Sequence, residues 1–539
     1  MPSLSPETKK LIQEYKKWHN SLKPKEKVGV IHADEVAGKV AAFYEKIRGI
    51  IDWKEEHLLK RGAIERILKR KLLVESEIIS QEKDNKKLAE SLVLELIRGG
   101  YFPNDTIEIS KINEVQSALK KYIFILKNLP RQQNKSKLEF YGWIISISAC
   151  EIEEILSPAL KEMALINYMT NLMKQRIKLD PVLSKKISEK EKNTLIFIAV
   201  CQALFNLDSP IIYYHLLKIQ YPDWKNLPKE KLIKFSQDIQ KIYSDFERLI
   251  NHPFADKFYQ ICKKYNTPYI ILNDILSKEE PEIIEKKIEN PEFLEKSIKN
   301  AYMKRLSTLK ARLTRAAFYS TLSIFITNVA SLLAVEIPLT KYITGHFNFL
   351  AIAVDVLGPT FLMAFLVVTI PPPKKENLNV VIVETMKIVY ESKKKDIYEI
   401  KFFPKKGLIL NAIIGFFYFL TFIAVISIIV FFLYKINFPP LSYIIFIIFF
   451  SLIAFAGTKI REKVKELEMI EEKETFIQFI LDPFAIPIIQ LGKWLTTKWK
   501  KYNLISVFFS AIIDMPFSIF VEFIEQWRYF LKEKKEKLH

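Results

Sequence analysis

The sequence predicts an all-α, polytopic membrane protein with a large cytoplasmic helical domain, four transmembrane helices and C-terminal amphipathic helices in the membrane plane. Two segments, 408–434 and 438–457, carry no charge, and each supplies the roughly 20 apolar residues that cross a bilayer core. The first 300 residues place apolar side chains at helical spacing. Lysine and arginine gather on alternate sides of the apolar segments, which is typical of a protein with several spans.

Residues 1–300 are expected to form two cytoplasmic helical subdomains. In "VAGKVAAFYEKIRGII" (36–51) the apolar residues recur on one helical face. Prolines separate helices of ordinary length, and the polar stretch "NLPRQQNKSK" (128–137) is the expected subdomain boundary. Only "NDTIEIS" (104–110) alternates in the manner of a strand.

A long helix is expected to lead from this domain into the membrane. Between Glu292 and Ile337 there is neither glycine nor proline, which predicts one helix of about 45 residues. Its second half, 316–336, and the segment 347–370 are the two less apolar spans. The fourth span is expected to continue as a cytoplasmic helical stalk over 458–481, packed antiparallel to the long helix.

The charges beside the spans predict their orientation. Residues 304–315 hold five basic residues and no acidic one, and 371–407 hold nine lysines. The segments 337–346 and 435–437 hold one lysine each. Because positive residues mark the cytoplasmic side, we expect both termini in the cytoplasm and the protein in the plasma (inner) membrane.

The C-terminal region is expected to lie on the membrane rather than cross it. A fifth span over 504–530 would place the basic tail outside, and Asp514 and Pro516 favour a new helix start in the middle of this stretch. A related pattern, Asp followed by Pro-Phe, an apolar helix and Trp, occurs at 482–494. Tryptophan beside lysine is typical of an interfacial helix. The predicted anchors are Trp494, Trp499, Trp527, Lys493, Lys500 and Lys501.

One polar pair is expected inside the membrane. Asp355 and Asn328 should lie at the same depth on the first two spans. A carboxylate within a span is costly and indicates function by default, here a proton or cation relay. The structural alternative is a neutral or paired Asp355 that holds the two helices together.

No catalytic, cofactor-binding or metal site is predicted. The 13 glycines include no phosphate-binding loop, and the histidines are scattered. The three cysteines match no metal or redox spacing and are expected to be reduced and buried. In "CEIEEIL" (150–156), Glu151 and Glu154 are expected on an exposed acidic face.

The charge pattern bears on partners. The net charge is +20, but acidic and basic residues are interspersed, so we expect contact with anionic lipid on the cytoplasmic face and no binding of nucleic acid. A cytoplasmic or membrane protein partner is expected, and a homo-oligomer would be required to form a pore.

Two stretches carry a resemblance. "FYEKIRGIIDWKEEHLLKRGAIERILKR" (43–70) and "DMPFSIFVEFIEQWRYFLKEKKEK" (514–537) resemble uncharacterised helical membrane proteins of uncultivated small-genome bacteria. The resemblance implies a helical membrane protein and brings no activity.

The favoured function is a non-enzymatic membrane anchor or scaffold. The alternatives are an ion- or proton-coupled transporter module that uses Asp355, and a lipid-interacting or lipid-modifying protein, for which Asp482 and Asp514 supply only part of a site. The expected divisions are 1–130 and 131–300 (cytoplasmic subdomains), 292–370 (long helix and first hairpin), 371–407 (cytoplasmic insertion), 408–457 (second hairpin), 458–481 (stalk) and 482–539 (interfacial helices and tail).

Overall fold

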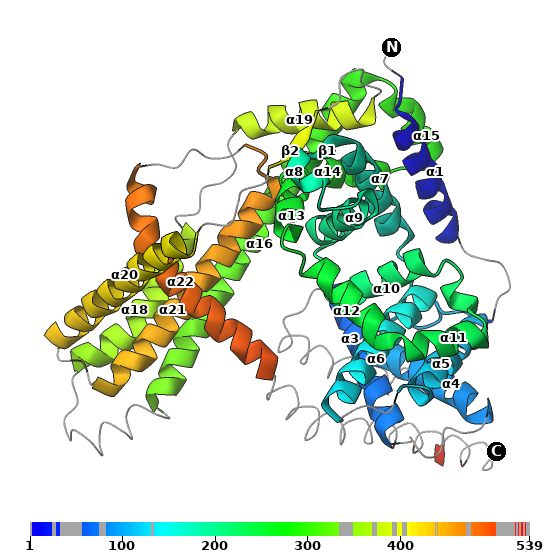
Figure 1. Ribbon diagram of the computed structural model, residues 1–539, viewed down its shortest axis with the longest axis horizontal. Coiled ribbons are helices and arrows are strands. Elements are labelled where there is room, and N and C mark those ends of the chain that lie inside the picture. The colour runs from blue at the N-terminus through cyan, green and yellow to red at the C-terminus, as the bar shows by residue number, and fades with distance from the viewer. Residues whose placement is uncertain are drawn as a thin grey trace. The chain divides into compact units, whose positions relative to one another are not determined.

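The computed structural model describes a chain that is mostly helical, which confirms the all-α fold class (Figure 1). The chain divides into two compact units, each assembled from segments that are distant in sequence. The described residues are 3–23, 29–32, 56–74, 82–130, 134–333, 349–368, 375–390, 396–401, 407–436, 438, 440–470 and 476–502, with single residues 523, 527, 530, 531 and 534.

One unit, here called the helical unit, comprises 13–175, 184–262 and 504–539. Its described elements are the second half of α1 (Pro6–Ser21), α3 (Glu56–Val74), α4 (Glu82–Arg98), α5 (Ser110–Lys127), α6 (Asn134–Leu156), α7 (Leu160–Arg176), α9 (Glu189–Phe205), α10 (Ser209–Gln220), η1 (Trp224–Asn226), α11 (Lys229–Gln237), α12 (Ile239–Ile250) and most of α13 (Ala255–Lys264).

The core of the helical unit forms around α6. This helix packs against α3, α5 and α10, and it is apolar on most sides, as a central helix must be. Trp143 of α6 is buried among the rings of Tyr213, Phe235, Tyr243 and Phe246. The stretch 128–137 therefore connects two helices that pack on each other, α5 and α6, inside a single unit.

Local sequence signals explain individual helix ends. Ser188 accepts a hydrogen bond from the backbone N–H of Glu191 at 3.2 Å and so caps α9, in the Ser-x-x-Glu pattern of a capping box. The helix ends at Asn206, which adopts φ 50° in the left-handed region where asparagine is tolerated.

The predicted strand at 104–110 forms only a short pairing. The backbone N–H of Ile31 donates to Ile107 O, and that of Ile109 donates to Gly29 O, both at 2.9 Å. These bonds flank an antiparallel bridge between Val30 and Glu108. The strand-like stretch therefore pairs with one short segment, residues 29–31.

The other unit, here called the long-helix unit, comprises 1–12, 176–183 and 263–503. Strands β1 (Ile177–Leu179) and β2 (Tyr398–Ile400) pair in parallel within it. Its helices include α8 (Pro181–Ser184), α14 (Thr267–Leu276), α15 (Pro281–Ile288), α16 (Pro291–Ser331), α18 (Phe349–Val368), α19 (Lys375–Val389), α20 (Leu408–Lys435), α21 (Pro440–Val464), η3 (Lys465–Leu467) and α22 (Phe476–Tyr502).

The expected long helix is present as α16. It contains 41 residues, about 60 Å at 1.5 Å per residue. Asn290 Oδ1 accepts the backbone N–H of Glu292 at 2.9 Å, and Pro291 occupies the first turn, where a missing N–H costs nothing. The expected end at Ile337 lies outside the described residues. The expected insertion is also ordered, as α19 and β2.

The four helices α16, α18, α20 and α21 lie together in the long-helix unit (Figure 1). α18 packs against both α16 and α21. The contacts of α18 follow the order of residues along α21. Val354 packs against the cluster of Leu433 and Phe438 at the turn before α21, Gly358 lies beside Phe446, and Leu366 lies beside Gly457. The two helices therefore run in the same direction. The turn between α20 and α21 lies beside the first half of α18.

The fourth apolar helix ends earlier than the predicted stalk. α21 stops at Val464, η3 follows, and residues 468–470 are not helical. Asn377 of α19 is 1% exposed, and it forms hydrogen bonds with the backbone of this segment. Its Oδ1 accepts the N–H of Met469 at 2.7 Å, and its Nδ2 donates to Leu467 O and to the Tyr302 hydroxyl. The apolar residues of 458–467 keep helical spacing in the sequence. The helix nevertheless ends, because Asn377 forms hydrogen bonds with backbone groups of 467–470.

We expect Asn377→Ala to lower the free energy of unfolding by about 2–3 kcal/mol, because it leaves several buried backbone groups without partners. Proteolysis after 464–470 should accelerate together with the loss of stability, measured on the full chain in mild detergent. Asn411→Ala, on the exposed start of α20, is the matched control. Equal resistance of both variants would show that Asn377 does not hold this chain end.

The C-terminal helix begins before the predicted start at Asp482. α22 runs from Phe476 to Tyr502 and contains Pro483 and Pro487 in its interior. Asp482 therefore does not cap a helix start. The helix continues through this local start signal from Phe476 onward.

Candidate functional site

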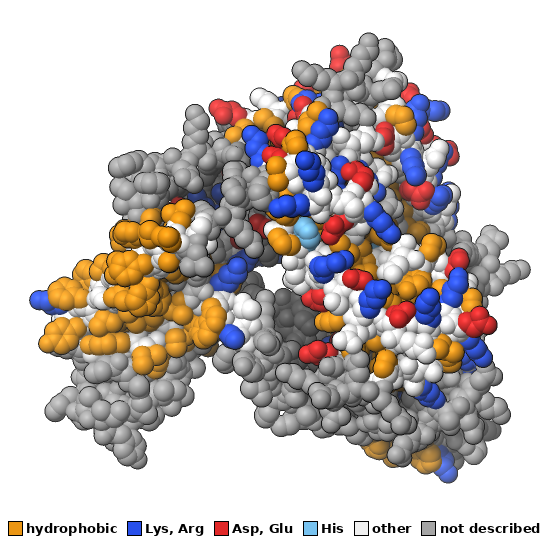
Figure 2. Space-filling view, viewed as in Figure 1, with side chains coloured by type: hydrophobic (Ala, Val, Ile, Leu, Met, Phe, Trp, Pro, Cys, Tyr) orange, Lys and Arg blue, Asp and Glu red, His pale blue; other side chains and the backbone are white. Residues whose placement is uncertain are grey.

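Among the described residues, two helices are long and apolar enough to cross a membrane, Ile409–Lys435 and Tyr443–Glu462. Only 11% and 17% of their most apolar windows are buried, unlike the core helix of a soluble domain. Figure 2 shows apolar side chains covering this part of the long-helix unit. The large apolar residues exposed on α20 are Ile409, Leu410, Ile413, Ile414, Phe416, Phe417, Phe419, Leu420, Ile423, Ile428, Phe431 and Phe432.

The two weaker predicted spans also expose apolar faces. On α18, Leu357, Phe361 and Phe365 recur every four residues, so they share one face. On α16, Phe318 and Ile326 are exposed along the second half of the helix. Averaged over each helix, α18 is nearly as apolar as α20 and more apolar than α21, and only α16 is markedly less apolar.

The structure places the predicted polar pair on neighbouring helices. Asn328 is on α16 and Asp355 is on α18, and these helices pack along each other. Their side chains lie outside the described residues. Pro359 lies inside α18, one turn after Asp355. Because proline has no N–H, it cannot donate the helical hydrogen bond to the carbonyl of Asp355.

The predicted anchors divide between α22 and the tail. Trp494 and Lys493 are exposed on α22. The side chains of Trp499, Lys500 and Lys501 lie outside the described residues, as do Asp514 and Pro516. In the tail, Trp527 is 50% exposed. Its ring stacks between those of Phe523 and Phe530, with centroids 6.4 and 5.8 Å away.

α22 packs against α21, and its interfacial position stays a prediction. It crosses α21 at Gly492, where a methyl group would meet the carbonyl of Ser451, close to the midpoint of α21. A Cβ there would also lie 2.9 Å from Phe455 Cβ. Gln490 and the Tyr418 hydroxyl of α20 form a hydrogen bond of 2.8 Å. The small residues Gly492 and Ser451 permit this close crossing, and they are the sequence signal that could have indicated it.

The prediction of an exposed acidic face at 150–156 is wrong for Glu151, which is 2% exposed. Its carboxylate accepts two bonds from Lys121 Nζ at 2.7 and 2.8 Å. It also accepts from the Tyr122 hydroxyl at 2.6 Å and from Trp224 Nε1 at 2.9 Å. Burial lowers the pKa of Lys121, against the opposing effect of Glu151. These partners come from α5 and η1, so spacing within α6 could not reveal them.

The buried, reduced cysteines are confirmed. Cys150, Cys201 and Cys262 are free and buried, and burial raises the pKa of each thiol. Cys150 also lines a pocket.

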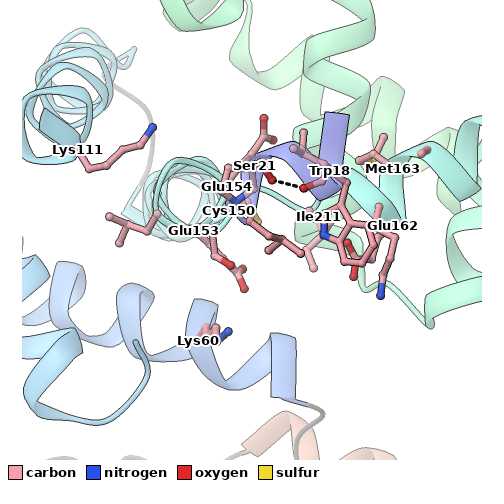
Figure 3. A pocket seen from close by; sticks show the side chains of 18 of the residues that line it. Trp18, Ser21, Lys60, Lys111, Cys150, Glu153, Glu154, Glu162, Met163 and Ile211 are labelled. Atoms are coloured by element: carbon pink, nitrogen blue, oxygen red, sulfur yellow. Dashed lines mark hydrogen bonds between the residues drawn. The ribbon is translucent and has the colours of Figure 1, made fainter. Parts of the chain in front are cut away.

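This pocket lies within the helical unit and has a volume of about 1260 Å³ (Figure 3). Its walls come from the end of α1, from α3, from 105–111, from the end of α6, from the start of α7 and from α10. Apolar side chains such as Trp18, Met163 and Ile211 line it together with charged ones. Its lining holds six carboxylates and four lysines, an acidic excess in a chain whose net charge is strongly positive.

Glu153 is the least neutralised carboxylate at the end of α6. Its neighbour Glu154 pairs with Lys218 and Lys225, which hold its pKa below the usual value although burial raises it. No ion pair reaches Glu153 among the described residues. Burial raises the pKa of Glu153 to about 7, against the effects of Arg61 and Lys60.

The two nearby cations are engaged elsewhere. The Arg61 guanidinium forms a bidentate ion pair with Asp208. Lys60 Nζ lies over the ring of Phe102, 5.5 Å from its centroid. Figure 3 shows Glu153 directed from α6 toward the side of the pocket formed by Lys60.

In the described part of the chain, no three His, Cys, Asp or Glu side chains form a group that could hold a metal ion. No protein-family model, no curated protein and no solved structure matches the chain. The resemblance of residues 43–70 and 514–537 therefore stays a prediction.

Proposed function

We propose that the chain is a non-enzymatic integral membrane anchor or scaffold that presents the helical unit to a protein partner. The observation that carries this proposal is the charge-free surface of α20. Its large apolar side chains are exposed on every side over 409–420, and water would not tolerate so extensive a patch. A bilayer core covers such a helix without further partners.

A four-span arrangement is part of the proposal. The apolar outward faces of α16 and α18 support two spans in addition to α20 and α21. The shared direction of α18 and α21 also supports it, because this direction gathers the lysine-rich segments at one end of the helices. That end faces the cytoplasm and its anionic lipid, and the membrane is the plasma (inner) membrane.

Cysteine labelling tests the membrane arrangement. In intact cells, a membrane-impermeant maleimide should label Lys435→Cys, beyond the end of the apolar part of α20, but not Lys401→Cys, next to β2. The native cysteines are buried and their thiols stay neutral, so they give little background. Labelling of both variants only after lysis, or extraction of the protein by alkaline carbonate, would contradict the proposed arrangement.

The scaffold function needs a partner. Purification of the full chain from native membranes in mild detergent should yield one stoichiometric protein partner. A homo-oligomer with nothing attached would contradict the scaffold and favour the transporter alternative.

The transporter alternative rests on a specific feature of α18. The backbone carbonyl of Asp355 receives no helical hydrogen bond from Pro359, so this carbonyl and the Asp355 carboxyl group offer two oxygen ligands for a cation in one turn of an apolar helix. In liposomes, Asp355→Asn would abolish ion or proton flux in a transporter. An anchor would keep its abundance and its partner after the same substitution.

A further inference from the structure

The pocket of the helical unit has a feature that membrane anchoring does not explain. The last two turns of α6 carry Glu151, Glu153 and Glu154, at the helix end where the backbone dipole is already negative. Two of the three carboxylates have lysine partners. Among the described residues Glu153 has none, although it is largely removed from water and lines a pocket.

We propose that this pocket binds a small organic cation, a protonated amine or guanidinium on an apolar or aromatic body, with Glu153 as its counter-ion. Lysines of the described chain neutralise Glu151 and Glu154, and a bound cation would neutralise Glu153 in the same way. The volume exceeds that of a simple amine and is of the order of small-molecule sites, so the rest of the ligand also has room.

The walls fit the body of such a ligand. Trp18 of α1, Met163 of α7 and Ile211 of α10 bring apolar surface to the same pocket. The Trp18 ring already accepts a cation on one face, since Lys161 Nζ lies 5.0 Å from its centroid. An aromatic amine would therefore find both an apolar wall and a carboxylate.

Tryptamine and tryptophol are a suitable pair of probes, because they differ mainly in the ammonium and hydroxyl groups. Calorimetric titration of the full chain in mild detergent at pH 8 should show at least tenfold tighter binding of tryptamine. Equal affinity for the two compounds, or no binding of tryptamine, would overturn the proposal.

Two variants locate the counter-ion. Glu153→Gln should reduce the affinity for tryptamine to that for tryptophol. The substitution removes a partly buried charge that has no ion pair among the described residues, so the variant should fold at least as well as the wild type. Glu162→Gln changes another carboxylate of the same lining and should leave the affinity within about threefold. An equal loss in both variants would indicate a diffuse acidic field and overturn the assignment.

The pH dependence provides a second readout. Since the pKa of Glu153 is about 7, lowering the pH from 8 to 6 should weaken tryptamine binding about tenfold. Burial lowers the pKa of His215 in the pocket to about 4, so it stays neutral over this range. The charged groups that act on Glu153 are Arg61 and Lys60 of α3 and Asp208 before α10. Binding that is unchanged by pH in the wild type would contradict the role of Glu153.

Discussion

Replacement of Gly492 by alanine is expected to loosen α22 from the hairpin of α20 and α21. The added methyl group meets the main-chain carbonyl of Ser451, and its carbon would lie 2.7 Å from the carbonyl carbon. A flexible side chain could move aside, but a backbone inside a helix cannot do so without shifting the helix. We expect a loss of about 3 kcal/mol in the free energy of unfolding, at the upper end for overpacking.

The effect can be measured as unfolding of the full chain in mixed micelles, followed by tryptophan fluorescence. The control is Gly415→Ala in the middle of α20, where a Cβ has no neighbour within 4 Å. That variant should be unchanged or more stable by up to about 1 kcal/mol, because alanine favours a helix over glycine. If both variants unfold alike, α22 does not cross α21 at Gly492.

The second large effect is expected at the buried ion pair of the helical unit. Glu151→Gln leaves the ammonium of Lys121 without its counter-charge in a position that is 7% exposed. Breaking a buried pair in this way costs about 3–5 kcal/mol. Chemical denaturation of the full chain should show this loss, with the change assigned to the helical unit by its tryptophan signal.

A matched control separates burial from ion pairing itself. Lys111 and Glu114 are also 2.7 Å apart, but their side chains are 28% and 49% exposed. Glu114→Gln should therefore cost less than about 1 kcal/mol. The double variant Lys121→Met with Glu151→Leu should regain part of the stability, since neither charge is then buried. A loss at Glu114 as large as that at Glu151 would refute this account.

The features that could be predicted from the sequence are those whose signal lies within one helix or one residue. The charge-free runs of α20 and α21 identify both helices, and the absence of glycine and proline after Pro291 identifies α16. The burial of the cysteines follows from their chemistry alone. In each case the signal lies within the element that it describes.

The features that were predicted wrongly from the sequence depend on partners that are distant in sequence. Glu151 was expected in solvent because its neighbours in α6 are acidic, whereas Trp224, 73 residues away, and Lys121 decide its burial. The end of α21 depends in the same way on Asn377 of α19. Glu153 differs from Glu151 and Glu154 because those two carboxylates pair with lysines of other helices. Such pairs cannot be predicted from the spacing of residues within α6.

Because α16 is one continuous helix, we expect a movement at one of its ends to be transmitted to the other end. Its first half is fastened to α14 by the ion pair of Arg305 with Asp274, and the same helix continues along α18. A rod of about 60 Å that pivots by ~5° displaces its far tip by ~5 Å, roughly the rise of one helical turn. In the proposed membrane arrangement, a change in bilayer thickness that tilts the apolar helices would therefore also displace α14 and α19.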